Sequence, residues 1–200
     1  MEKKKFALSK QQCLGVLETA RSYSFLHELM IETQLLTGLR VGELVNLRIE
    51  DINLNDNTIQ IKEHLKSENV DEWKPKTEFS PRVIPINSTL SMKLSNHLKK
   101  NDQTNGYFFT SRKGCAFAIE SVISFINKYA RETKSLKKNI GSHALRRTFA
   151  SFMLSDGHSI WEVSRLLGHS SIKFTIVYLF GMNNNDNYNE IRESQMKMIT

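Results

Sequence analysis

The chain has 200 residues, of which 40% are hydrophobic and 24% are charged, a balance typical of a globular domain that buries its own core. No apolar run approaches the ~18 residues of a membrane-spanning helix, and the apolar core of a signal peptide does not follow the basic N-terminal segment. These features exclude a protein with a membrane-spanning helix. The net charge of +7 favours a polyanionic partner, nucleic acid first and an anionic membrane surface second.

Apolar residues at helical spacing predict two helices and a short third one in the first part of the chain. Leu14, Val16 and Leu17 mark the first helix, and the apolar residues between positions 25 and 36 mark the second. Gly38 is expected to end the second helix, because glycine readily takes the left-handed conformation of a helix C-terminus. The segment VGELVNL (41–47) predicts the short helix.

The period then changes to an alternation of apolar and polar residues, which predicts three strands. The three segments are RIEDINL (48–54), TIQIKEH (58–64) and RVIPI (82–86). Residues 55–57 form the turn of a hairpin. Pro85 places the third strand at an edge of the sheet, and the polar segment 64–81 predicts a loop.

The remainder of the chain returns to helical periodicity. Apolar stripes mark three helices, within residues 90–98, 122–130 and 145–153. Ser159 begins a capping box with Glu162, and Gly168 should end that helix. Ser170 or Ser171 can cap a last helix that carries Tyr178. The predicted fold is a single α+β domain over residues 1–200, mainly α, with a small three-stranded antiparallel sheet.

The sequence lacks the motifs of a zinc site and of a nucleotide-binding site. The spacings of His143, His158 and His169 fit no zinc pattern, and neither a phosphate-binding P-loop nor a GxGxxG motif occurs. We therefore expect no metal and no cofactor. Cys13 and Cys115 are far apart and in no ligand spacing, so we expect two buried or half-buried thiols in a reducing compartment.

Cationic side chains instead gather at the breaks between helices. Arg40 follows the glycine break in TGLRVGEL, with Glu43 within reach, and His143 and Arg146 share one face of a helix in HALRRTFASFML. His169 lies in LLGHSS, between a helix-ending glycine and a capping serine. Taken singly, each of these residues has an ordinary explanation. Arg40 could form a surface salt bridge with Glu43, His143 and Arg146 could belong to a solvated basic face, and His169 could be a loop histidine.

Taken together, TGLRVGEL, HALRRTFASFML and LLGHSSIKFTIVY resemble the catalytic domain of tyrosine recombinases, the phage-integrase and Xer-like family, over almost the whole chain. The resemblance implies that Arg40 and Arg146 hold the scissile phosphate. It also implies that His143 and His169 are the two histidines of the site and that Tyr178 is the nucleophile. Glu43 matches a supporting acidic residue of the first segment.

The family also needs a lysine on the hairpin between its second and third strands. Lys74 and Lys76 are both candidates, and Lys76 fits the pattern K-T-x-x-x-x-R-x-I-P better. The implied reaction is attack of Tyr178 on a phosphodiester, with Lys76 protonating the departing 5′ oxygen. The 3′-phosphotyrosyl link keeps the bond energy, so no ATP is needed. The two arginines and a histidine could replace a metal ion in stabilising the charge on the phosphate.

The resemblance leads us to expect a site-specific recombinase, an integrase of a mobile element, in the cytoplasm and associated with the nucleoid. Its expected partners are double-stranded DNA at a specific site, further copies of itself in a tetramer on that DNA, and accessory DNA-bending proteins. A catalytically silent DNA-binding regulator, a short invertase-type recombinase and a type IB topoisomerase remain as alternatives.

Two departures from the family stand out. Phe180 stands where the family often has a histidine. The sequence starts directly with the catalytic domain, so we expect a chain without the N-terminal core-binding domain of the family, either a fragment or a short single-domain member.

Overall fold

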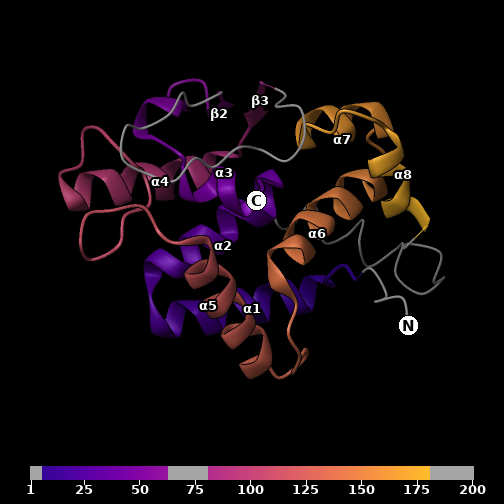
Figure 1. The fold of residues 1–200 in the computed structure, drawn as a ribbon, viewed down its shortest axis with the longest axis horizontal. Coiled ribbons are helices and arrows are strands. Elements are labelled where there is room, and N and C mark those ends of the chain that lie inside the picture. Colours follow the sequence, from indigo (N-terminus) through magenta and orange to yellow (C-terminus); the bar gives the residue numbers. More distant parts are fainter. Residues whose placement is uncertain (1–5, 63–80, 181–200) are drawn as a thin grey trace.

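The computed structural model describes residues 6–62 and 81–180, with side chains up to residue 176 (Figure 1). Helices dominate these residues, as predicted. The elements are α1 (Lys10–Tyr23), α2 (Phe25–Thr37), α3 (Val41–Val45), the 3₁₀ helix η1 (Ile49–Asp51), β1 (Ile52–Asn53), β2 (Thr58–Ile61), β3 (Arg82–Pro85), α4 (Ser88–Asn101), α5 (Ile119–Glu132), α6 (Gly141–Ser155), α7 (Ile160–Leu167) and α8 (Lys173–Phe180). The expected α+β class is confirmed.

The predicted helix ends coincide with local capping structures. The Ser159 hydroxyl accepts a hydrogen bond from the Glu162 N–H (3.2 Å), while the Glu162 carboxylate accepts one from the Ser159 N–H (2.8 Å), which completes the predicted capping box of α7. Gly38 ends α2 with φ 65°. A Cβ on Gly38 would lie 2.4 Å from Phe149 Cδ1, so this glycine also lets α2 approach α6 closely.

The sheet is antiparallel in the order β1-β2-β3, with Ile59 opposite Ile84. Pro85 lies on an edge strand, as predicted. The prediction of a strand over residues 48–54 is wrong for its first half, where the chain forms η1. The Asp51 carboxylate accepts a hydrogen bond from the Arg48 N–H (3.0 Å), and this local cap closes a turn in place of strand pairing. The predicted loop 64–81 lies outside the described residues, apart from Pro81.

The core has two parts, and α6 takes part in both. The larger one fills the space among α1, α2, α4, α5 and the sheet. A smaller one joins α6 to α7 through Phe149, Ala150, Val163 and Leu167. Figure 1 shows α6, α7 and α8 grouped at one end of the molecule, with β3 next to α7. The second core therefore fixes α7 relative to α6, on which two of the predicted site residues lie.

The two cysteines lie in different surroundings. Cys13 is buried, which raises the pKa of its thiol to about 12, whereas Cys115 is exposed, so the prediction of a buried or half-buried thiol is wrong for Cys115. Cys115 lies in a surface turn, where few apolar side chains are available to cover it. Among the described helices, none is long and apolar enough to cross a bilayer.

Candidate active site

Three arginine side chains from distant parts of the chain converge on the C-terminal end of α7. The last carbonyls of a helix lack partners within the helix and carry partial negative charge, so cations bind them well. The bonds run from Arg82 Nε to the Leu166 oxygen (2.7 Å), from Arg146 Nη2 to the Leu167 oxygen (2.5 Å) and from Arg40 Nη2 to the Gly168 oxygen (3.0 Å). Each of three consecutive carbonyls therefore receives a different arginine.

Glu43 joins two of these arginines. Its Oε1 accepts hydrogen bonds from Arg40 Nη1 (2.9 Å) and Arg82 Nη1 (3.0 Å). Its Oε2 accepts from the Arg40 backbone N–H (2.8 Å) and Arg82 Nη2 (2.7 Å). Burial alone would raise the pKa of the Glu43 carboxyl, but the bonds and charge of Arg82 and Arg40 outweigh burial and lower that pKa. Glu43 is thus a carboxylate, and it is shared between two cations.

Arg146 lies on α6 and is buried. Besides the Leu167 carbonyl, its guanidinium donates to the Gly38 carbonyl at the end of α2 (2.6 Å). One planar fork therefore ties together the ends of α2 and α7. The sequence predicted that Arg40 and Arg146 act together, and the structure places both guanidinium groups at the same helix end.

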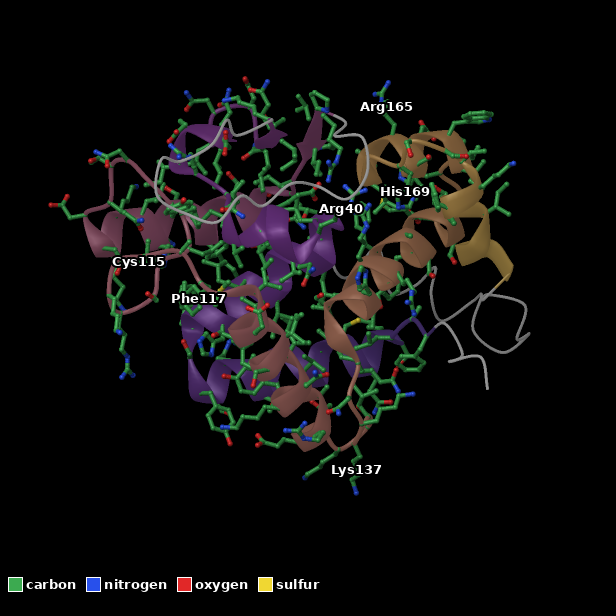
Figure 2. All side chains as sticks on the ribbon, in the orientation of Figure 1. Arg40, Cys115, Phe117, Lys137, Arg165 and His169 are labelled. Atoms are coloured by element: carbon green, nitrogen blue, oxygen red, sulfur yellow. The ribbon has the colours of Figure 1, made fainter. Side chains whose placement is uncertain are left out.

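His169 directly follows this helix end and lies beside the arginines. Figure 2 shows Arg40 and His169 next to one another near α7. The His169 Nδ1 is 2.8 Å from the hydroxyl of Thr175, a buried residue on α8. Burial, followed by the charges of Arg146, Arg40 and Arg82, lowers the pKa of the His169 ring to about 3. The ring is therefore neutral at physiological pH.

His143 lies on the first turn of α6 and is close to the same arginine charges. Its side chain is exposed, but the protein atoms around the ring and the charges of Arg147, Arg146 and Arg40 lower its pKa. The structure thus brings His143, Arg40, Arg146 and His169 into one region.

The remaining predicted residues are placed only in part. Tyr178 lies on α8, which packs against α6 and α7, and its side chain is outside the described atoms. Lys76 and the alternative Lys74 lie between β2 and β3, outside the described residues. Their roles remain predictions.

The sequence analysis gave no role to two residues of this region, Arg82 and Thr175. Arg82 stands at the arginine of the pattern that selected Lys76, and the alternation in RVIPI places it on the same face as Ile84 and Ile86. A charge on a buried strand face must have a partner, since an unpaired buried charge is costly. Thr175 had no comparable signal, because hydroxyl groups are common on helices of every kind.

Gly168 allows Arg82 to reach the end of α7. Gly168 has φ 63°, and a Cβ there would lie 2.7 Å from Arg82 Nη1. We expect Gly168→Ala to lower the free energy of unfolding by more than the ~1–2 kcal/mol of a left-handed alanine, because Arg82 must also move. Gly141→Ala is the matched control, with φ 64° and nothing within 4 Å of the added Cβ. Urea unfolding measures both losses, and equal losses would show that the Arg82 contact has no energetic weight.

The pKa of His169 makes stability depend on pH. The folded ring has a pKa of about 3 against an ordinary value of 6.5, so between these values the unfolded chain binds a proton that the folded chain does not. Stability should therefore fall as the pH is lowered from about 6.5 toward 3. We expect His169→Asn to flatten this slope in urea unfolding at several pH values, and His158→Asn, at an exposed position, to leave it unchanged. The same slope in the His169 variant as in the wild type would contradict the assignment.

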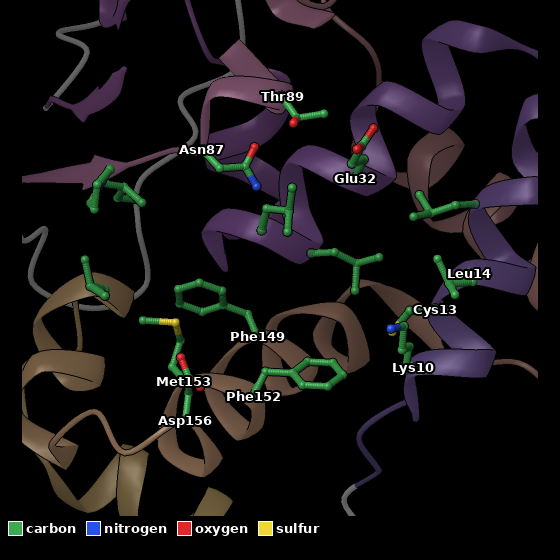
Figure 3. Close-up of a pocket in the computed structure, with 16 residues that line it drawn as sticks. Lys10, Cys13, Leu14, Glu32, Asn87, Thr89, Phe149, Phe152, Met153 and Asp156 are labelled. Carbon is green, nitrogen blue, oxygen red and sulfur yellow. The ribbon is translucent and has the colours of Figure 1, made fainter. Parts of the chain in front are cut away.

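A separate apolar cavity of about 560 Å³ lies among α1, α2, α6 and the chain around β3 (Figure 3). Leu14, Leu35, Phe149, Phe152 and Met153 are among its lining residues. None of the arginine or histidine residues at the end of α7 lines this cavity. It suits an apolar segment rather than a phosphate.

The phage integrase family model matches residues 7–183. A tyrosine recombinase of Agathobacter rectalis is 30% identical over 183 residues, which cover 89% of this chain and 55% of that protein. A tyrosine recombinase of Pseudothermotoga lettingae is 34% identical over 152 residues, covering 76% of this chain and 48% of that protein. The chain spans about half the length of these curated relatives.

Solved structures show the same fold. A crystal structure of XerA recombinase superposes with a TM-score of 0.76 at 23% identity, covering 98% of this chain and 66% of that one. The Tn1549 transposon integrase in complex with transposon right end DNA gives a TM-score of 0.72 at 22% identity, covering 98% and 67%. With the family model matching almost its whole length, the chain belongs to the phage integrase family of tyrosine recombinases.

Proposed function

We propose that this chain is the catalytic part of a site-specific DNA recombinase that cuts and rejoins DNA through a 3′-phosphotyrosyl intermediate. The observation that carries the proposal is the convergence of Arg40, Arg146 and the neutral His169 at one end of α7. The next helix, α8, carries Tyr178. In the described cluster, the three arginines exceed the single carboxylate of Glu43, so the region attracts an anion.

The proposed step begins with the Tyr178 oxygen attacking the phosphorus of a DNA phosphodiester. The new P–O bond to Tyr178 forms as the bond to the 5′ oxygen breaks, and Lys76 gives that oxygen a proton. The tyrosyl proton passes to His143 or to water. A second 5′-hydroxyl can reverse the reaction, because the phosphotyrosyl bond retains the energy of the bond that was broken.

The arginines would stabilise the negative charge that builds up on the non-bridging oxygens during this attack. A guanidinium has five N–H donors in a plane and matches two such oxygens. The hydrogen bonds of Arg40 to Glu43 and Gly168 use two donors of its side chain, which is 30% exposed. Because these bonds hold the guanidinium in place beforehand, little reorganisation is needed when the phosphate arrives.

A covalent-trapping experiment tests this proposal. The wild-type chain is mixed with nicked suicide duplexes taken from DNA that flanks its gene, and the reaction is stopped with detergent. A detergent-stable, protease-sensitive band is expected. DNA binding without such a band, in this chain and in the longest product of its gene, would favour the catalytically silent regulator. Relaxation of any supercoiled plasmid would instead favour the topoisomerase.

The choice between the two lysines can be made by the leaving group. We expect Lys76→Ala to slow cleavage by about 10²-fold, as loss of a general acid does. A 5′-thiol leaving group needs no proton, so a duplex with a bridging 5′-phosphorothiolate should restore the rate. Lys74→Ala is the matched control and should cleave both duplexes like the wild type. The reverse pattern would assign the general acid to Lys74.

We further propose that the chain acts on double-stranded DNA at a specific sequence and that it serves a mobile genetic element. We also propose that it works in the cytoplasm, associated with the nucleoid. Accessory DNA-bending proteins would assist it. The solved structure of the Tn1549 transposon integrase in complex with transposon right end DNA supports a DNA partner and a mobile element. The net charge of +7 supports DNA binding.

Self-association on DNA, up to a tetramer, belongs to the same proposal. The apolar cavity between α1 and α6 could bind a segment of a neighbouring copy. The last residues of the chain could supply that segment, since they include Tyr188, Ile191, Met196, Met198 and Ile199. Sedimentation of the chain with a duplex that carries two half-sites would count the copies.

A further inference from the structure

Arg82 is a buried cation that the proposed chemistry does not use directly. Its side chain is 3% exposed, as is that of Glu43, to which it donates two hydrogen bonds. Taking an arginine out of water is costly unless its partners compensate for the lost hydration. Here the Glu43 carboxylate and the Leu166 carbonyl provide that compensation.

The first effect concerns charge. Glu43 also binds Arg40, so without Arg82 the Glu43 carboxylate would be paired with Arg40 alone and would neutralise its charge. A fully paired Arg40 would offer a phosphate little net attraction. With Arg82 present, Arg82 and Glu43 neutralise one another, and Arg40 keeps its positive charge for another anion.

The second effect concerns position. The same guanidinium reaches from Glu43 on α3 to the carbonyl of Leu166 on α7, and it packs against Gly168 with no room for a Cβ. His169 follows Gly168 directly in the chain. The distance between Arg40 and His169 is therefore set in part by a side chain that belongs to neither segment.

We propose that Arg82 is a positioning residue of the strand-transfer reaction, an inference that rests on the function proposed above. Arg82 neutralises Glu43, so that the charge of Arg40 is directed at the scissile phosphate. It also holds the end of α7, so that His169 lies beside Arg40.

The test uses the rate of covalent trapping in a single turnover and the affinity for the same duplex. Arg82→Met keeps the length of the side chain and removes its charge. We expect it to cleave about 10²-fold more slowly, with duplex affinity within about threefold of the wild type, because a buried side chain contributes little to phosphate contacts. Arg21→Met is the matched control, since Arg21 also binds a buried glutamate, Glu28, through two N–H groups. It should cleave like the wild type.

A double variant separates charge from simple packing. In Arg82→Met/Glu43→Gln the buried pair is neutral, and Arg40 no longer faces a carboxylate. We expect this variant to regain at least about tenfold of the lost rate, because the charge of Arg40 becomes available again. A residue needed only for folding would not be rescued by removing its partner. A double variant that is no faster than Arg82→Met, or an Arg82→Met variant as fast as Arg21→Met, would overturn the proposal.

Arg82→Lys covers the case in which Arg82→Met does not fold. Lysine keeps the charge but cannot donate to Glu43 and Leu166 in the geometry of the planar fork. We expect cleavage about tenfold slower than in the wild type at unchanged duplex affinity. A rate equal to that of the wild type would show that the fork positions nothing.

Binding of orthovanadate distinguishes failure of this inference from failure of the proposed function. If the wild type forms no covalent product with any duplex, the proposed function fails, but calorimetric titration with vanadate still probes the oxyanion site. We expect at least about tenfold weaker vanadate binding in Arg82→Met and recovery in the double variant. Equal binding by all three proteins, or none by the wild type, would overturn the role of Arg82.

Discussion

The Tyr178→Phe variant is expected to bind the same duplex as the wild type and to form no covalent product. The substitution removes one oxygen, which is the atom that would become bonded to phosphorus, and keeps the aromatic ring. Loss of a nucleophile lowers a rate by about 10⁴-fold or more, which is below detection in a trapping gel. Duplex affinity, measured by a mobility shift, should stay within about twofold because the substitution removes a single hydroxyl and leaves the cationic phosphate contacts of the arginines unchanged.

The control for this experiment is Tyr188→Phe, which removes the same hydroxyl from another tyrosine near the C-terminus. It should give as much covalent product as the wild type. Covalent product from Tyr178→Phe would place the nucleophile elsewhere, and its loss from Tyr188→Phe would move the assignment to that residue.

The Arg146→Lys variant is expected to lose both stability and cleavage. Arg146 is buried and donates to the carbonyls of Gly38 and Leu167 at once through two nitrogens of its planar fork, a geometry that the compact ammonium of a lysine does not reproduce. A buried carbonyl left without a donor costs about 1–3 kcal/mol. Loss of one arginine donor to the phosphate should slow cleavage by about 10²–10³-fold.

Urea unfolding and single-turnover trapping measure the two losses separately. Arg147→Lys is the control, because Arg147 is the next residue on α6 and is only half-buried. It should change the unfolding free energy by less than about 0.5 kcal/mol and the cleavage rate by less than about threefold. Losses of equal size in both variants would contradict a specific role for Arg146.

The helices were predictable because their signals are local. Ser159, Gly38 and Gly168 mark helix ends through hydrogen bonds and backbone angles within a few residues, and apolar spacing shows which face is buried. The segment 48–54 was not predictable in the same way. Alternation indicated a strand there, but the side chain of Asp51 closes a turn instead. A strand and a turn are both compatible with the alternation of apolar and polar residues in this segment, and they differ only in their free energies.

The resemblance to the family indicated four residues of the cluster, Arg40, His143, Arg146 and His169, but it assigned nothing to Arg82 or Thr175 and did not indicate how these residues are connected. The sequence could not show that Glu43 is shared by two arginines or that three arginines bind successive carbonyls of α7.

The sequence by itself determined the periodicity, the caps and the family of this protein, because each depends on short runs of residues. The tertiary structure decided which charges are buried together. Arg82 and Glu43 are 39 positions apart, and Arg146 and Gly38 are 108 apart. No local rule pairs such residues, since their hydrogen bonds form only when packing brings them within about 3 Å.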